Sequence, residues 1–117
     1  MKLSKERIIA DWGKLSNVER DAWVASALTH TYPHCPRYTT DISAAWDVVT
    51  KMQEKGFSFL LNEATERSAG VVHGNASAGD YHCNFMKDPT AYRVYHPSAT
   101  EAICLAALIA KYTEVSE

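Results

Sequence analysis

The sequence predicts an α+β fold in a single domain, with an antiparallel β-sheet meander of about four strands packed with helices. Before residue 57 and after residue 97, apolar residues recur every three or four positions, which is typical of helices. Between residues 57 and 96 the apolar period changes to two, which is typical of strands. With 117 residues the chain can bury one core, so one domain over residues 1–117 is expected.

The N-terminal residues 1–13 predict a short helix. Ser4 is a suitable N-cap, and Gly13 is expected to end the helix because glycine is common just after a helix C-terminus. A helix this short is marginal alone, so we expect it to pack on the domain or on a second subunit. The apolar residues expected on its packed face are Ile8, Ile9 and Trp12.

Residues 16–56 are expected to form two helices joined by a loop. Ser16 and Glu19 have the spacing of a capping box, and the helix that they begin is expected to reach about Leu28. Its apolar stripe consists of Val18, Ala22, Trp23 and Ala25. The segment 29–38 has two prolines and no apolar period, so it is expected to be a loop or an extended segment.

The second of these helices is predicted to begin after Thr40 or Asp41, either of which would cap it, and to end at Gly56. Lys51 and Lys55 suit its C-terminal end, because the helix dipole is negative there. The residues expected to be buried are Ile42, Ala45, Trp46, Val49, Met52 and Gln53. Those expected to face solvent are Ser43, Asp47, Thr50, Lys51 and Glu54.

Residues 57–96 are expected to form the β-meander from four segments, FSFLLNE, AGVVHG, DYHCNFMK and TAYRVYH. The separators GNASAG and KDP are turn-like, so consecutive strands are expected to pair antiparallel. Alternation places the residues of each strand on two opposite faces of the sheet. In the first strand Phe57, Phe59 and Leu61 lie opposite Ser58, Leu60 and Asn62, and in DYHCNFMK Tyr81, Cys83 and Phe85 lie opposite His82, Asn84 and Met86. In TAYRVYH, Tyr92, Val94 and His96 lie opposite Arg93 and Tyr95.

Residues 98–112 predict a final helix. Ser98 and Glu101 again have the spacing of a capping box. The helix is apolar on more than one side, so we expect it to lie across the sheet, and it is also suited to contact with a neighbouring subunit. Its apolar residues are Ala102, Ile103, Leu105, Ala106, Ala107, Leu108 and Ile109.

Charge and hydropathy argue against several classes of protein. The chain has 12 Lys and Arg against 14 Asp and Glu, whereas a protein bound to duplex nucleic acid is usually basic. The start MKLSKERIIADW lacks the apolar core of a signal peptide, and EAICLAALIAKY is shorter than the roughly 20 apolar residues of a membrane span. We therefore expect a cytoplasmic protein with neither a nucleic-acid polymer nor a membrane as partner.

Neither a metal site nor a catalytic centre is expected. His30 and His34 have HxxxH spacing beside Cys35, but Pro33 and Pro36 exclude the helix that would align the two rings on one metal. The sequence contains no GxSxG, HExxH or phosphate-binding glycine pattern. We therefore expect a non-enzymatic protein without a cofactor. Three cysteines without CxxC spacing do not predict a disulfide framework, and Cys83 and Cys104 are expected to be small core residues.

Two groups of residues could hold a small ligand. The segment 37–40 puts a cation, a ring and two hydroxyls at a helix start, where phosphate can bind, and the strand TAYRVYH carries a cation and a ring on one face. Both groups also have a plainer interpretation, as a helix cap and as an exposed sheet face, and residue types alone favour it. The candidate ligand residues are Arg37, Tyr38, Thr39, Thr40, Arg93 and Tyr95.

The stretches YTTDISAAWDVVTKMQEKGFSF and SATEAICLAALIA resemble the phage ABA sandwich domain, a family of small phage proteins. Its members share an aromatic-Ser/Thr-x-Asp-Ile-x-x-Ala-Trp helix, a strand meander and a closing Ala-Ile-x-x-Ala-Ala-Leu helix. The resemblance covers roughly residues 16–112, but the segment 62–82 is longer than the family pattern and lacks its Trp, so no role is carried over to it. The matching residues are Tyr38, Thr39, Asp41, Ile42, Ala45, Trp46, Ala102, Ile103, Ala106, Ala107 and Leu108.

This resemblance implies a phage-encoded protein. In size and layout the family is similar to phage sponge proteins, which oligomerise and sequester nucleotide signals of CBASS or Thoeris defence without cleaving them. By that analogy of fold, the resemblance implies a homo-oligomer that binds a small cyclic nucleotide in the cytoplasm of the infected host. The alternative is a structural or protein-binding phage accessory protein with no nucleotide ligand.

Overall fold

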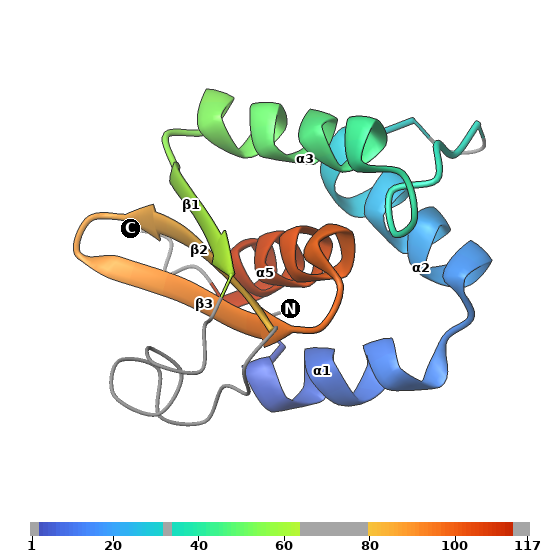
Figure 1. The fold of residues 1–117 in the computed structure, drawn as a ribbon, viewed down its shortest axis with the longest axis horizontal. Coiled ribbons are helices and arrows are strands. Elements are labelled where there is room, and N and C mark those ends of the chain that lie inside the picture. Colours follow the sequence, from blue (N-terminus) through green and yellow to red (C-terminus); the bar gives the residue numbers. More distant parts are fainter. Residues whose placement is uncertain (1–2, 32–33, 64–79, 114–117) are drawn as a thin grey trace.

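The computed structural model describes residues 3–31, 34–63 and 80–113, and it confirms the predicted α+β class (Figure 1). The helices are α1 (Lys5–Lys14), α2 (Asn17–Val24), the π-helix η1 (Ala25–Thr29), α3 (Ile42–Glu54) and α5 (Ala99–Thr113). The strands are β1 (Ser58–Glu63), β2 (Tyr81–Lys87) and β3 (Thr90–His96). No helix in the described part of the chain is long and apolar enough to cross a membrane.

The three strands form an antiparallel sheet in the order β1-β2-β3. The predicted meander is confirmed for these strands, whereas the predicted segment AGVVHG lies outside the described residues. The predicted alternation is also confirmed, because the apolar sets of all three strands pack on the core. The opposite face, called the outer face below, carries three cross-strand rows: Ser58–Met86–Ala91, Leu60–Asn84–Arg93 and Asn62–His82–Tyr95.

The core is built around α5, in which nine consecutive residues, Ala102 to Ala110, are buried. This helix contacts β2 and β3 on one side and α1, η1 and α3 elsewhere (Figure 1). The helix that was expected to lie across the sheet therefore packs against two of its strands. Its remaining apolar sides are covered by helices of the same chain, so they give no separate support for a subunit contact.

Cys83 and Cys104 are both fully buried, as predicted. Burial raises the pKa of the Cys83 thiol to about 12. Burial also raises the pKa of Cys104, and the nearby carboxylate of Asp21 acts in the same direction. Both thiols are therefore neutral near pH 7 and pack as small apolar groups.

The buried face of α3 differs from the predicted one. Ala45, Val49 and Met52 are buried as expected, and the other buried positions are Ala44 and Val48. This stripe faces α5 and β1, and two alanines in it let those elements approach closely.

Three residues predicted to be buried on α3 point outward instead. Ile42 and Trp46 are 51% and 52% exposed, and Gln53 is exposed as well. The Trp46 ring rests edge-on against Phe59 of β1, with ring centroids 5.6 Å apart. Trp46 therefore borders the core at the edge of the sheet instead of filling it.

The first helix is longer than predicted. Ser4 caps α1 by accepting from the Arg7 N–H, but the helix continues through Gly13 to Lys14. The chain leaves the helix at Leu15, whose extended backbone does not require glycine. Of the three residues expected on the packed face, Ile8 and Trp12 are buried and Ile9 is exposed.

The first predicted capping box is confirmed. The Ser16 N–H donates to Glu19 Oε1 at 2.9 Å, and the Glu19 N–H donates to Ser16 Oγ at 3.2 Å. The apolar stripe predicted for this helix is wrong at Val18, which is 77% exposed, because α2 turns Asp21 and Val24 inward instead.

Only half of the second predicted capping box forms. The Glu101 N–H donates to Ser98 Oγ at 3.3 Å, but the Ser98 N–H donates to His96 Nδ1 at 2.9 Å. The Glu101 carboxylate forms an ion pair with Arg20 of α2, which explains why it does not complete the box.

Replacing Ala106 by leucine is expected to lower the free energy of unfolding by about 1–3 kcal/mol, because its Cβ is fully buried in a packed core. Urea denaturation measures the loss. Lys111→Leu, at an exposed position of the same helix, is the matched control. An Ala106→Leu variant as stable as the control would show that space remains beside α5.

Candidate functional site

Tyr38, one of the predicted ligand residues, lies in the core and is 1% exposed. Its hydroxyl is 2.8 Å from Thr29 Oγ1 and 3.0 Å from Thr31 Oγ1. Its backbone carbonyl accepts from Cys104 Sγ at 3.5 Å. Tyr38 therefore ties the loop before α3 to η1 and α5, and its position does not support the predicted contact with a ligand.

Thr39 is also buried, and it is held by a carboxylate that the sequence analysis missed. Its N–H and its hydroxyl donate to Asp21 Oδ1 at 2.9 and 2.8 Å. Its carbonyl accepts from Thr100 Oγ1 of α5. The sequence signal for this contact was the acidic residue Asp21, which lies on the buried side of α2. A buried carboxylate requires hydrogen-bond donors, and Thr39 supplies them.

The start of α3 is capped by Asp41, which settles the choice between Thr40 and Asp41. The Asp41 carboxylate accepts from the Ser43 N–H at 2.9 Å, and its own N–H donates to the Arg37 carbonyl at 2.8 Å. A carboxylate therefore already occupies the positive end of the helix dipole. A phosphate bound there would meet Asp41, so the predicted phosphate position has little electrostatic advantage.

A cleft of about 660 Å³ lies between α2 and the loop before α3. Of the predicted ligand residues, Arg37 and Thr40 line it, and both are exposed. Its volume is that of a small-molecule site. The other described residues that line it are Asn17, Val18, Asp21, Ala22 and Cys35, so this described lining combines one cation with one carboxylate.

Arg93 and Tyr95 share the outer face of the sheet, as predicted. The Tyr95 ring stacks on the His82 ring, with centroids 4.9 Å apart and planes 19° from parallel. His82 Nδ1 in turn lies 3.0 Å from Asn62 Oδ1, so one row of side chains is connected across all three strands. Sequence reasoning placed Asn62 and His82 on alternating strand faces but could not pair them, because pairing depends on strand register.

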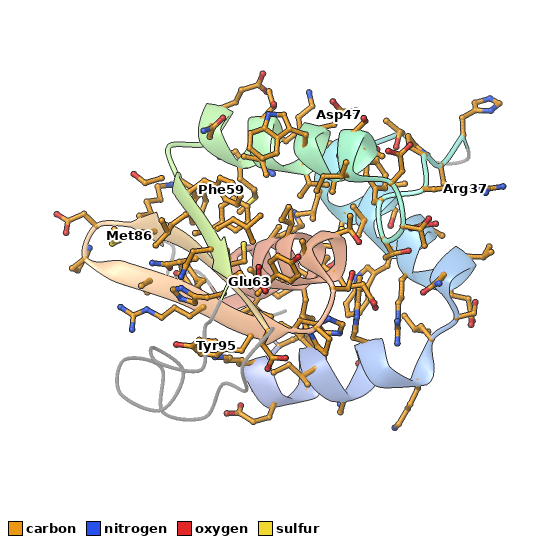
Figure 2. The ribbon with its side chains drawn as sticks, viewed as in Figure 1. Arg37, Asp47, Phe59, Glu63, Met86 and Tyr95 are labelled. Atoms are coloured by element: carbon orange, nitrogen blue, oxygen red, sulfur yellow. The ribbon has the colours of Figure 1, made fainter. Side chains whose placement is uncertain are left out.

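The six predicted ligand residues thus fall into three separate places. Arg37 and Thr40 line the cleft, Tyr38 and Thr39 are internal, and the β3 pair lies on the outer face. Figure 2 shows Arg37 and Tyr95 far apart in the molecule. One small ligand in one protomer cannot contact both ends of this set.

The histidines and cysteine considered as metal ligands are not gathered into a metal site. His30 follows η1 with a left-handed backbone φ of 57°, and its side chain is exposed. His34 is exposed, and Cys35 lines the cleft. Within residues 3–31, 34–63 and 80–113, no three His, Cys, Asp or Glu side chains are grouped closely enough to hold a metal ion.

Comparisons with known proteins identify the family and the fold. The model of the phage ABA sandwich domain matches residues 6–108. Among solved structures, the chain is similar to a phage protein from Bacillus cereus ATCC 14579, with a TM-score of 0.61 and 17% sequence identity. The similarity covers 81% of this chain and 91% of that one. No curated protein matches the sequence.

Thr39→Val is expected to lower the free energy of unfolding by about 1–2 kcal/mol, since it removes one of the two donors that the described residues supply to the buried Asp21 carboxylate. The neighbouring Thr40→Val is the matched control, because Thr40 is exposed and should change stability by less than about 0.5 kcal/mol. Chemical denaturation of the two variants compares them directly. Equal losses would contradict the structural role of the Thr39 hydroxyl.

Proposed function

Because the chain belongs to the phage ABA sandwich domain family, we propose that it is a non-enzymatic phage protein that binds a small cyclic nucleotide. By sequestering that nucleotide in the host cytoplasm it would inhibit an anti-phage defence of the CBASS or Thoeris type.

The observation that supports this proposal best is the composition of the outer face. Arg93 is exposed and makes no hydrogen bond or ion pair with the described residues, so its guanidinium is available to a phosphate. Arg93 lies beside the Asn62–His82–Tyr95 row. The side chains of that row are held by the contact between Asn62 and His82 and by the stacking of Tyr95 on His82. A cation next to ordered rings and amides suits a ligand made of phosphate and base.

The cleft supports nucleotide binding less well. Arg37 is the one cation among the described residues that line it, and Asp21 lines the same cleft. The next residue after Thr40 is the capping carboxylate of Asp41. We therefore assign the nucleotide to the outer face, keep Arg37 and Thr40 as a secondary position, and leave the buried Tyr38 and Thr39 out of the proposed site.

We also propose a homo-oligomer. Its support is the large apolar side chains that remain exposed in the protomer, since exposed apolar surface is typical of contact regions. These side chains are Ile9, Val18, Ile42, Trp46, Leu60 and Met86.

Isothermal titration with cyclic di- and trinucleotides and cyclic ADP-ribose isomers is expected to find at least one ligand with a Kd below about 10 micromolar, near −7 kcal/mol. Arg93→Ala should weaken that binding at least about tenfold, because it removes the charge-assisted pair with phosphate. Arg37→Ala should have a smaller effect. Chromatography of the recovered ligand should show it intact.

Lys51→Ala is the control for a general change in charge, because Lys51 is an exposed residue of α3. If no nucleotide in the panel binds, the proposal is wrong. If the recovered ligand is fragmented, the protein is an enzyme. A larger loss for Arg37→Ala than for Arg93→Ala would move the site to the cleft.

The second candidate is a protein-binding accessory protein without a nucleotide ligand, and the outward face of α3 favours it. Ile42 and Trp46 lie one turn apart there, each about half exposed. They line a shallow depression of about 370 Å³ with Ser43 and Asp47. Tryptophan is enriched among the residues that dominate protein interfaces.

If this α3 face joins copies of the chain, wild-type protein should be oligomeric in multi-angle light scattering and Trp46→Ser should be monomeric. The substitution is expected to change the Tm little, because half of the Trp46 side chain is already exposed. Leu60→Ser, an equally exposed apolar residue on the outer face, is the control. A monomeric wild type, or an unchanged oligomer in Trp46→Ser, would remove α3 as the contact.

A further inference from the structure

Asn84 occupies the centre of the outer face, and its side-chain carbonyl lacks a hydrogen-bond partner. The residue is 7% exposed, and its Oδ1 is buried with no partner in the described part of the chain. Position 84 is the middle residue of β2, the middle strand. A buried carbonyl without a partner lowers the stability of the fold, so its presence calls for an explanation.

The two neighbours of Asn84 in its cross-strand row differ from it in chemistry. Leu60 of β1 is paired with it on one side and is half exposed. Arg93 of β3 is paired with it on the other side and is exposed. The row therefore places an exposed apolar side chain, a largely buried amide and an exposed guanidinium in line across about 10 Å, two spacings between strands.

Packing of the sheet does not explain an asparagine at this position. Asparagine is disfavoured in strands, and valine or threonine would fit the pleated surface better. The next outer-face position on β2 is Met86, so the face accepts an apolar side chain there. Residues that lower stability in this way are expected where a protein binds something.

We propose that the Leu60–Asn84–Arg93 row reads the base of the bound nucleotide, and that this base presents an N–H donor beside an acceptor, as adenine does. This inference rests on the proposed function and names its ligand class. The Asn84 amide offers one donor and one acceptor side by side, and adenine matches them with its amino group and the adjacent ring nitrogen. Leu60 packs on the base, and Arg93 pairs with a phosphate.

The nearby row Asn62–His82–Tyr95 limits how the ligand lies. Asn62 Oδ1 and His82 Nδ1 are already 3.0 Å apart, so those two atoms are engaged within the row. The Asn84 carbonyl is an outer-face acceptor without a donor among the described side chains. The amino group of the base is therefore directed to Asn84, whose Oδ1 is buried in the free protein and turns outward to accept it.

The test compares AMP with purine riboside 5′-monophosphate, in which a hydrogen atom replaces the amino group. NMR titration of the ¹⁵N-labelled full chain follows the side-chain amide of Asn84 and the guanidinium of Arg93. AMP is expected to shift both signals, and the analogue should bind at least about tenfold more weakly, because it leaves the Asn84 carbonyl unpaired.

The outcomes separate this inference from the proposed function. Equal binding of the two nucleotides on the outer face would overturn the reading of the base and leave nucleotide binding intact. Shifts confined to the cleft around Arg37 would overturn the assignment to the row. If neither nucleotide shifts any signal, and the cyclic nucleotides do not bind, both proposals fail.

A pair of variants tests whether Asn84 serves binding or structure. Asn84→Val should keep or raise the Tm and should abolish the difference between the two nucleotides, because it removes a buried side-chain carbonyl without a partner. Asn62→Val, the matched control on the same face, should lower the Tm because it removes the partner of His82. A Tm loss in Asn84→Val as large as that in the control would show that the amide is structural and would overturn the proposal.

Discussion

The complete burial of α5 is the constraint on which the rest of the fold depends. A helix with nine consecutive buried residues points apolar side chains in every direction, so no single surface can cover it. The sheet covers one side, and α1, η1 and α3 cover the others. Alanine at positions 102, 106, 107 and 110 lets these neighbours approach closely. The short N-terminal helix α1 is part of this cover of α5. Its stability would be marginal in isolation, and here its packing on α5 stabilises it.

The loop before α3 is fixed by the Asp21 carboxylate, which joins that loop to α2, while Thr100 and Cys104 join it to α5. Threonine and aspartate before an apolar stripe correctly predicted a helix start, and the left-handed Gly56, with φ of 96°, correctly marked its end. The sequence did not reveal that Thr39 would donate to a residue 18 positions earlier. Such a contact depends on how two helices pack, and local capping rules contain no information on that.

Period-two alternation, one capping box and the burial of α5 were all predictable, because each depends on neighbours along the chain. The buried face of α3 was not, since Ile42 and Trp46 are as apolar as Val48 and only the packing partner decides which of them turn inward. The rows of the outer face were not predictable for a related reason. Alternation placed Asn84 and Arg93 on strand faces, but the register that makes them partners is set by the strands together.

The two exposed arginines of the predicted site differ in the charges around them, and this difference favours the outer face for an anion. Arg37 shares its cleft with Asp21, and the Asp41 carboxylate caps the adjoining helix. On the outer face, the residues in the Arg93 row and in both adjoining rows include no carboxylate. At a few ångströms, the repulsion between a carboxylate and a phosphate is comparable to the attraction between a guanidinium and a phosphate. A phosphate at Arg37 would therefore lose much of the electrostatic attraction that the guanidinium supplies. At Arg93 the attraction is opposed by no neighbouring negative charge in those rows.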